Sequence, residues 1–152
     1  MAEWEKIEIS VDGVARSASA PLIISASRAT DLPAFYSRWL MRHLEHGWVE
    51  KVNPFNNKPS WISLARARLF IFWTKNPLPL IAHLETLDRR GLHYYFQYTL
   101  NDYEAEGLEP GLPPLEERIA TFIGLSERIG PEKVIWRFAP LMPTDTLDVA
   151  AL

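Results

Sequence analysis

The sequence predicts an α/β fold: a parallel sheet of about five strands that curves like part of a TIM barrel and follows an N-terminal hairpin. Short apolar runs alternate with helical patterns between residues 22 and 138. This alternation is typical of parallel strands joined by right-handed crossovers. The chain has 152 residues, whereas a complete barrel of about eight strand–helix units takes about 250. We therefore expect a partial barrel.

The N-terminal part, residues 1–20, predicts a hairpin extension. The segments WEKIEIS and VARSAS flank Asp12 and Gly13, a dipeptide typical of a tight turn between antiparallel strands. The compact apolar segment at residues 22–26 then predicts the first strand of the main sheet.

The next unit predicts a helix and a second strand. Residues 31–47 carry large apolar side chains at helical spacing and end in Gly47, a residue that favours a helix C-cap. Residues 48–53 predict the second strand of the parallel sheet. Residues 54–68 are too rich in Pro and Asn for a long helix, so we expect a loop or hairpin with a short helical turn near Leu64.

Three further strands alternate with two helices. Residues 69–73 predict the third strand, and residues 77–91 predict a helix with an apolar face. Residues 94–99 predict the fourth strand, which a polar loop follows. Residues 115–130 predict the third long helix, and residues 134–138 predict the fifth strand.

The last residues of the sequence predict the first turns of another helix. Thr144 or Asp145 suits the N-cap of another helix, but the sequence ends soon afterwards, at Leu152. A helix this short is marginal by itself. We therefore expect residues 1–152 to form a single partial-barrel domain, the N-terminal fragment of a longer protein. Its exposed sheet edge favours a homodimer.

The composition is typical of a soluble, cytoplasmic, globular protein. Hydrophobic residues make up 47% of the chain, and no apolar run approaches the ~20 residues of a membrane span. The net charge of −3 disfavours a general nucleic-acid-binding surface. The chain has no cysteine, so it supplies no thiolate for a metal or an iron–sulfur cluster. We predict no metal ligands.

Each predicted strand of the main sheet switches to polar residues at its C-terminal end. In FIFWTKNP, four large apolar residues are followed directly by Thr74, Lys75 and Asn76. The carboxyl ends of parallel strands meet at one rim, where α/β proteins bind ligands. We therefore predict one pocket at this rim. Its candidate catalytic residues are Lys75 and Asp31, and its candidate ligand-binding residues are Ser27, Arg28, Asn53, Trp73, Thr74, Asn76, Gln97, Thr99 and Arg137.

Three of these residues are cations, and they suggest the ligand. Arg28, Lys75 and Arg137 suit a phosphate or a carboxylate, with Arg as a bidentate fork and Lys as a point charge. Lys75 and Arg137 directly follow apolar runs, where an unpaired cation is costly, so a functional role explains them better than a structural one. Gln97 and Thr99 share one strand face and fit either a site or a hydrogen-bonded core network.

Other residues in the set have structural explanations. Asn76 precedes a proline and fits a helix cap. Asp31 fits a helix cap or an ion pair with Arg28. Asn53 also precedes a proline and fits a turn.

Five blocks of the sequence carry a family resemblance that runs from about Leu22 to Leu141. The blocks are ISASRATDLPAFYSRWL, VNPFN, FIFWTKNP, YYFQYTL and VIWRFAPL. They resemble the bacterial and archaeal family catalogued as domain of unknown function 1848. Members are usually considerably longer, and their C-terminal part carries cysteines similar to the iron–sulfur ligands of radical S-adenosylmethionine enzymes. They are loosely grouped with spore photoproduct lyase-like proteins.

The resemblance implies S-adenosylmethionine and an iron–sulfur cluster only in a longer form of the protein, since the cysteines are absent from this chain. The fifth block also departs from the family pattern. Ala139 stands where many members have an acid, which removes one carboxylate from the predicted rim.

Three functional hypotheses follow. The first is an enzyme domain whose rim binds an anionic small molecule or a nucleotide, with radical chemistry only in the longer form. The second is a nucleic-acid-processing protein, in which Arg28, Lys75 and Arg137 contact phosphates and Trp73 or Tyr98 stacks on a base. The third is a non-catalytic binding or scaffold domain. The sequence identifies neither a substrate nor a reaction.

Overall fold

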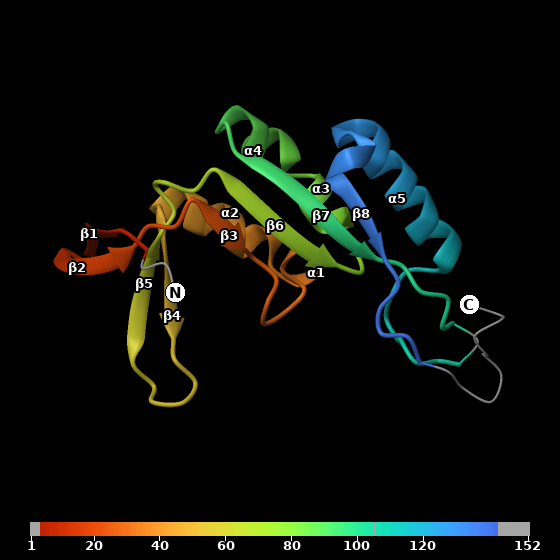
Figure 1. The fold of residues 1–152 in the computed structure, drawn as a ribbon, viewed down its shortest axis with the longest axis horizontal. Coiled ribbons are helices and arrows are strands. Elements are labelled where there is room, and N and C mark those ends of the chain that lie inside the picture. The colour runs from red at the N-terminus through yellow and green to blue at the C-terminus, as the bar shows by residue number, and fades with distance from the viewer. Residues whose placement is uncertain (1–3, 105, 143–152) are drawn as a thin grey trace.

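A computed structural model describes residues 4–104 and 106–142 of the chain (Figure 1). The strands are β1 (Lys6–Val11), β2 (Val14–Ser19), β3 (Ile23–Ser25), β4 (Trp48–Val52), β5 (Pro59–Ser63), β6 (Leu69–Thr74), β7 (His93–Thr99) and β8 (Val134–Arg137). The α-helices are α1 (Leu32–Phe35), α2 (Ser37–His46), α3 (Leu78–Ile81), α4 (Leu84–Arg89) and α5 (Leu115–Ile129). The helix expected to begin at Thr144 or Asp145 lies outside the described residues.

The described strands form two sheets. One is mixed, with the order β1-β2-β5-β4, and the other is entirely parallel, with the order β3-β6-β7-β8. The predicted α/β class with a parallel sheet is therefore confirmed. None of the described helices is long and apolar enough to cross a membrane.

The mixed sheet confirms one prediction and corrects another. β1 and β2 pair antiparallel around Asp12 and Gly13, whose φ angles of 50° and 80° suit the predicted hairpin. However, β4 pairs antiparallel with β5 and not with the parallel sheet. The parallel sheet consequently has four described strands where five were predicted. The charged and exposed Glu50 and Lys51 explain the difference, because a strand inside a helix-covered parallel sheet is normally apolar.

The predicted helices are present but shorter. The segment at 31–47 divides at Tyr36 into α1 and α2, and Gly47 ends α2 in the left-handed conformation with a φ of 82°. The segment at 77–91 divides into α3 and α4. The predicted helix at 115–130 is the continuous α5.

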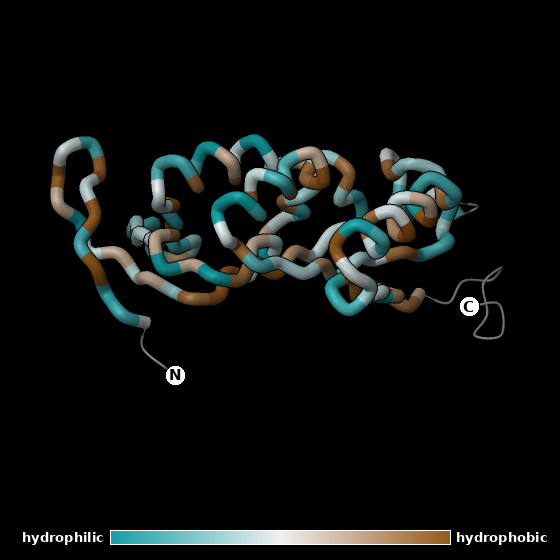
Figure 2. The backbone as a smooth tube through the Cα atoms, turned by 90° about the horizontal axis from the view of Figure 1, so that it is seen from above, coloured by the Kyte–Doolittle hydropathy of each residue, from teal (hydrophilic) through white to brown (hydrophobic). Residues whose placement is uncertain are grey.

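The parallel sheet has one face covered by helices, which we call the covered face. Figure 2 shows the helical coils along one side of the strands. On this face Phe70 and Phe72 of β6 lie beside Phe96 of β7 and are fully buried, with Leu80 of α3 and Leu125 of α5 in the same core. This packing supplies the hydrophobic core of the domain.

The opposite face of the parallel sheet, which we call the open face, is exposed or half-buried. Strand alternation places Trp73 and Ile135 there, in register with Gln97 between them. Trp73 is 44% exposed and Ile135 is 47% exposed. The described helices therefore leave an apolar face of the sheet uncovered.

Candidate functional site

A pocket of about 470 Å³ lies at the carboxyl-terminal end of β6. We call it the rim pocket. Its walls come from four parts of the chain: α1 and the residue before it, the turn after β6, the loop between β7 and α5, and the segment after β8. Asp31, Lys75 and Asn76 of the predicted set line it, together with Glu109. The pocket lies where α/β proteins usually bind ligands, at the carboxyl end of a parallel strand. The other predicted site residues are not among those that line it.

Asp31 joins the first helix to the end of β6. One carboxylate oxygen, Oδ1, accepts a hydrogen bond of 3.0 Å from the backbone N–H of Ala34 and caps α1. The other, Oδ2, accepts a bond of 2.7 Å from the backbone N–H of Lys75. The helix cap considered from the sequence is therefore present, and Asp31 also fixes the backbone of Lys75.

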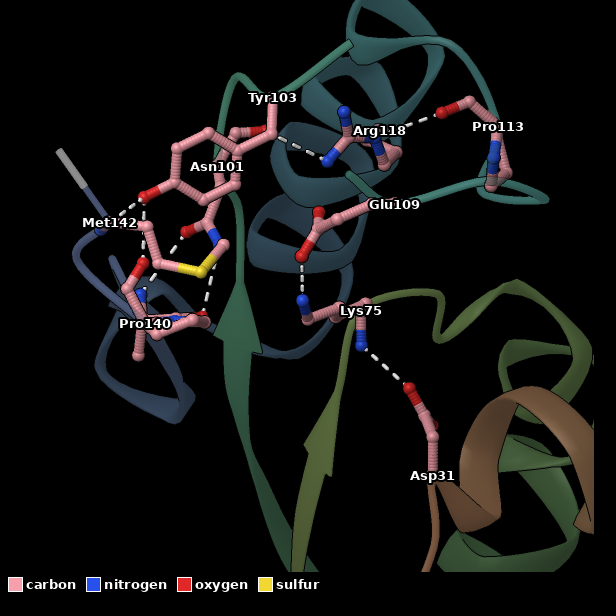
Figure 3. Close-up of polar contacts among 10 residues, drawn as sticks. Asp31, Lys75, Asn101, Tyr103, Glu109, Pro113, Arg118, Pro140 and Met142 are labelled. Atoms are coloured by element: carbon pink, nitrogen blue, oxygen red, sulfur yellow. Dashed lines mark hydrogen bonds and ion pairs between the residues drawn. The ribbon is translucent and has the colours of Figure 1, made fainter. Parts of the chain in front are cut away.

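The side chain of Lys75 points away from Asp31 and toward Glu109 (Figure 3). Its Nζ forms an ion pair with Oε1 of Glu109, whose side chain is only 13% exposed. Burial lowers the pKa of Lys75; nearby Arg118 lowers it further, and Asp31 acts in the opposite direction. Two carboxylates thus hold Lys75: Glu109 pairs with its ammonium group, and Asp31 accepts from its backbone N–H. Sequence reasoning identified only Asp31.

Arg118 is a second cation that the sequence did not single out. It lies in the first turns of α5, and its side chain is 2% exposed. Its Nε donates to the carbonyl of Pro113 at 2.9 Å, and its Nη1 donates to the carbonyl of Asn101 at 3.0 Å. Arg118 therefore pins both ends of the β7–α5 loop. Its position one turn before Phe122, on the inward face of α5, is the signal that could have identified it.

The beginning of the same loop is held against the segment after β8. The side-chain amide of Asn101 donates to the carbonyl of Ala139 at 3.0 Å and accepts from its N–H at 3.1 Å. The hydroxyl of Tyr103 donates to the carbonyl of Pro140 at 2.7 Å. These bonds make the two segments a fixed frame for one side of the rim pocket.

The other residues of the turn after β6 satisfy each other locally. Thr74 is buried, and its Oγ1 accepts a bond of 3.0 Å from the N–H of Asn76. The side chain of Asn76 accepts from the N–H of Leu78 at 3.2 Å, at the start of α3. The sequence suggested Asn76 as the N-cap, whereas the N-cap of α3 is Pro77, and Asn76 accepts from one residue further out. Asn76 also lines the pocket.

Arg137 and Trp73 lie together on the open face. The guanidinium carbon of Arg137 is 4.4 Å from the centroid of the Trp73 ring, a cation–π contact. Gln97 is in register with Trp73, and Thr99 is in register with Arg137. These four predicted site residues form a second group beside the rim pocket, and they are not among its lining residues.

The remaining predicted residues lie elsewhere. Arg28 lines a largely apolar cavity of about 570 Å³, between β3, α2 and the β4–β5 pair. Asn53 is in the β4–β5 turn, where its side chain accepts from the N–H of Phe55 at 2.9 Å, as the turn explanation expects. The Oγ of Ser27 is buried without a hydrogen-bond partner among the described residues.

The three predicted cations therefore do not converge on one pocket. Arg28 belongs to the apolar cavity, Lys75 to the rim pocket and Arg137 to the open face. The departure of β4 from the parallel sheet accounts for Asn53, because the end of β4 does not reach the rim of that sheet. In the described part of the chain, no group of three His, Cys, Asp or Glu residues could hold a metal ion.

The fold and this pocket define an α/β domain with a polar site at the carboxyl ends of parallel strands. Comparison with known families is more specific. The chain belongs to the family described as Domain of unknown function (DUF1848), whose model matches residues 23–152. The comparisons with curated proteins and with solved structures found no match.

Proposed function

We propose that this chain is a binding domain that holds an anionic small molecule or a nucleotide in the rim pocket. The observation that carries the proposal is the position of Lys75, whose ammonium group lines a pocket of about 470 Å³. A volume of this order suits a small ligand, and the carboxyl end of parallel strands is the usual ligand position in α/β proteins.

Each polar residue of the pocket has a role in this proposal. Lys75 supplies the positive charge that attracts the anion. Asp31 fixes the backbone of Lys75 through its 2.7 Å hydrogen bond, so the ammonium group starts from a defined place. If the ligand is a substrate, Lys75 and Asp31 are the candidate catalytic residues, because both line the pocket and burial lowers the pKa of Lys75.

Three further proposals concern the whole protein: its fold, its enzyme class and its location. On the open face, Ile71 is half-buried and Trp73 is exposed. We propose that the parallel sheet is part of a TIM-type barrel, because this face would then point into the barrel. Membership of a radical S-adenosylmethionine-like enzyme rests on the family resemblance alone. This chain has no cysteine, so an iron–sulfur cluster does not fit its residues, and the proposed binding does not involve one. We propose a cytoplasmic location from composition.

A second candidate function is nucleic-acid binding through the open face. The exposed Trp73, with Arg137 against its ring, is the observation that favours it. The net charge of −3 opposes it. Affinity for single-stranded nucleic acid that falls steeply with salt would favour this function over small-molecule binding. A scaffold role would show neither kind of binding.

The test is a calorimetric titration of the chain with inorganic phosphate and with nucleotides, repeated for Lys75→Met. We expect this variant to lose most of the affinity, because methionine keeps an apolar stem and lacks the charge. Lys58→Met is the matched control, since Lys58 is exposed in the β4–β5 turn, and it should bind like the unmodified chain. Equal affinity of Lys75→Met and Lys58→Met would contradict the proposal.

A further inference from the structure

Two carboxylates of the β7–α5 loop form ion pairs with two cations. Glu104 pairs with Arg118, at 3.4 Å between Oε1 and Nη2, and Glu109 pairs with Lys75. Figure 3 shows the second pair at the rim pocket, with Arg118 nearby on α5. Both carboxylates come from one short polar segment, but their surroundings differ.

Glu104 has a structural role. Besides its contact with Arg118, its Oε1 accepts a hydrogen bond from the backbone N–H of Leu115, the first residue of α5. It therefore caps the helix and helps to hold the loop. Its side chain is half exposed, and it is not among the residues that line the rim pocket.

Glu109 is placed differently. Its carboxylate lies inside the rim pocket, 13% exposed, and the contact that the structure gives it is the ion pair with Lys75. The ammonium group that the proposed ligand needs is thus already occupied by an acid from the chain itself. Since a carboxylate is chemically close to the ligand's proposed anionic group, Glu109 stands where that group would bind.

The loop segment that carries Glu109 lies between two glycines and borders two cavities. Gly107 and Gly111 flank it, with φ angles of 62° and 87° that other residues rarely adopt. Residues 109–112 line the rim pocket on one side and a second cavity of about 300 Å³ on the other. Arg118 lines that second cavity. The segment that carries Glu109 therefore borders a second space, next to the rim pocket, into which its side chain would turn if it left Lys75.

We propose that Glu109 is an internal competitor, and that a phosphate or carboxylate group of the ligand replaces its carboxylate on Lys75. This inference rests on the proposed function and adds the class of ligand and the way it enters. A phosphate with two negative charges displaces Glu109 more readily than a monocarboxylate does, because its attraction to Lys75 is stronger. The pocket should therefore prefer inorganic phosphate to acetate.

The test compares phosphate affinity, by calorimetry, in the unmodified chain and in Glu109→Gln. The amide keeps the size of the side chain and removes the competing charge, so we expect roughly fivefold tighter binding. Adding Lys75→Met to Glu109→Gln should abolish the gain. Glu104→Gln is the matched control from the same loop, and we expect it to lower thermal stability without increasing affinity.

The outcomes separate this inference from the proposed function. If the unmodified chain binds phosphate through Lys75 and Glu109→Gln does not bind it more tightly, the competitor role is wrong and the binding function stands. If neither protein binds phosphate, the competitor role is wrong, and the nucleotide titration then decides the binding function. Hydrogen exchange of the unmodified chain gives a second measurement, in which phosphate should speed exchange across residues 107–112. Unchanged or slower exchange there would also overturn the competitor role.

Discussion

The covered face of the parallel sheet and its carboxyl-terminal rim are built on opposite principles. On the covered face, Phe72 and Phe96 are buried among apolar side chains, and they face helices next to the sheet. At the rim, three residues after Phe72 and just beyond the end of β6, Lys75 contacts Asp31 through its backbone and Glu109 of a different loop through its side chain. The comparison teaches that apolar burial holds the sheet and helices together, while at the rim polar side chains satisfy each other across different parts of the chain.

The largest expected effect is on the covered face. Phe72→Ala should lower the free energy of unfolding by about 3–5 kcal/mol, because it removes buried surface and leaves a cavity. Lys75→Met should cost about 1 kcal/mol or less, since Glu109 can turn to solvent and the bond from the backbone N–H of Lys75 to Asp31 remains. Urea denaturation of both variants measures the difference.

Similar costs for Phe72→Ala and Lys75→Met would break the comparison. A loss of about 3–5 kcal/mol in Lys75→Met alone would show that its ion pair is a buried structural one. The rim pocket would then be part of the core and not a site.

The next largest effect is expected at Arg118, which lies near the rim but is buried like a core residue. Arg118→Met should lower the free energy of unfolding by about 3 kcal/mol, because it leaves the carbonyls of Asn101 and Pro113 without their donor. Arg128→Met, on the last turn of the same helix and exposed, is the control and should cost far less. If both variants lose the same free energy of unfolding, Arg118 does not anchor the loop.

The smallest effect is a pH dependence at the junction of the two regions. Tyr98 is buried on the covered face, and its hydroxyl donates to the carbonyl of Arg118 at 3.0 Å. Burial raises the pKa of Tyr98 to about 12 from its usual value of 10.0. Its stabilising contribution is therefore complete below pH 10 and is lost as the pH rises toward about 12.

Tyr98→Phe should consequently have a shallower loss of thermal stability between pH 10 and pH 12 than the unmodified chain. Burial also raises the pKa of Tyr94, so part of the alkaline loss should remain in the variant. Melting curves across this range measure the slope. An unchanged slope would mean that Tyr98 ionises without cost to the fold.

The sequence predicted the features that depend on local chemistry. The turn at Asp12 and Gly13, the end of α2 at Gly47, and the strands that became β6 and β7 all follow from neighbouring residues. The position of Lys75 at the rim also followed, because it depends only on where an apolar strand ends.

What the sequence did not predict depends on partners far along the chain. β4 pairs with β5 and not with the parallel sheet. The spacing of apolar residues predicts that a strand forms, but it does not say which strand it pairs with. The ion pair between Lys75 and Glu109 joins residues from two different loops. For the same reason, three cations at the ends of the first, third and fifth predicted strands were expected in one pocket and lie in three places.

The central claim is that the rim pocket, and not the apolar cavity or the open face, binds an anion. The most direct measurement follows backbone amide signals of the ¹⁵N-labelled chain by nuclear magnetic resonance during a phosphate titration. We predict saturable shifts at Lys75, Asn76 and residues 108–112, with little change elsewhere. Shifts that cluster instead around Arg28, or around Trp73 and Arg137, would contradict the claim, as would a titration that moves no signal.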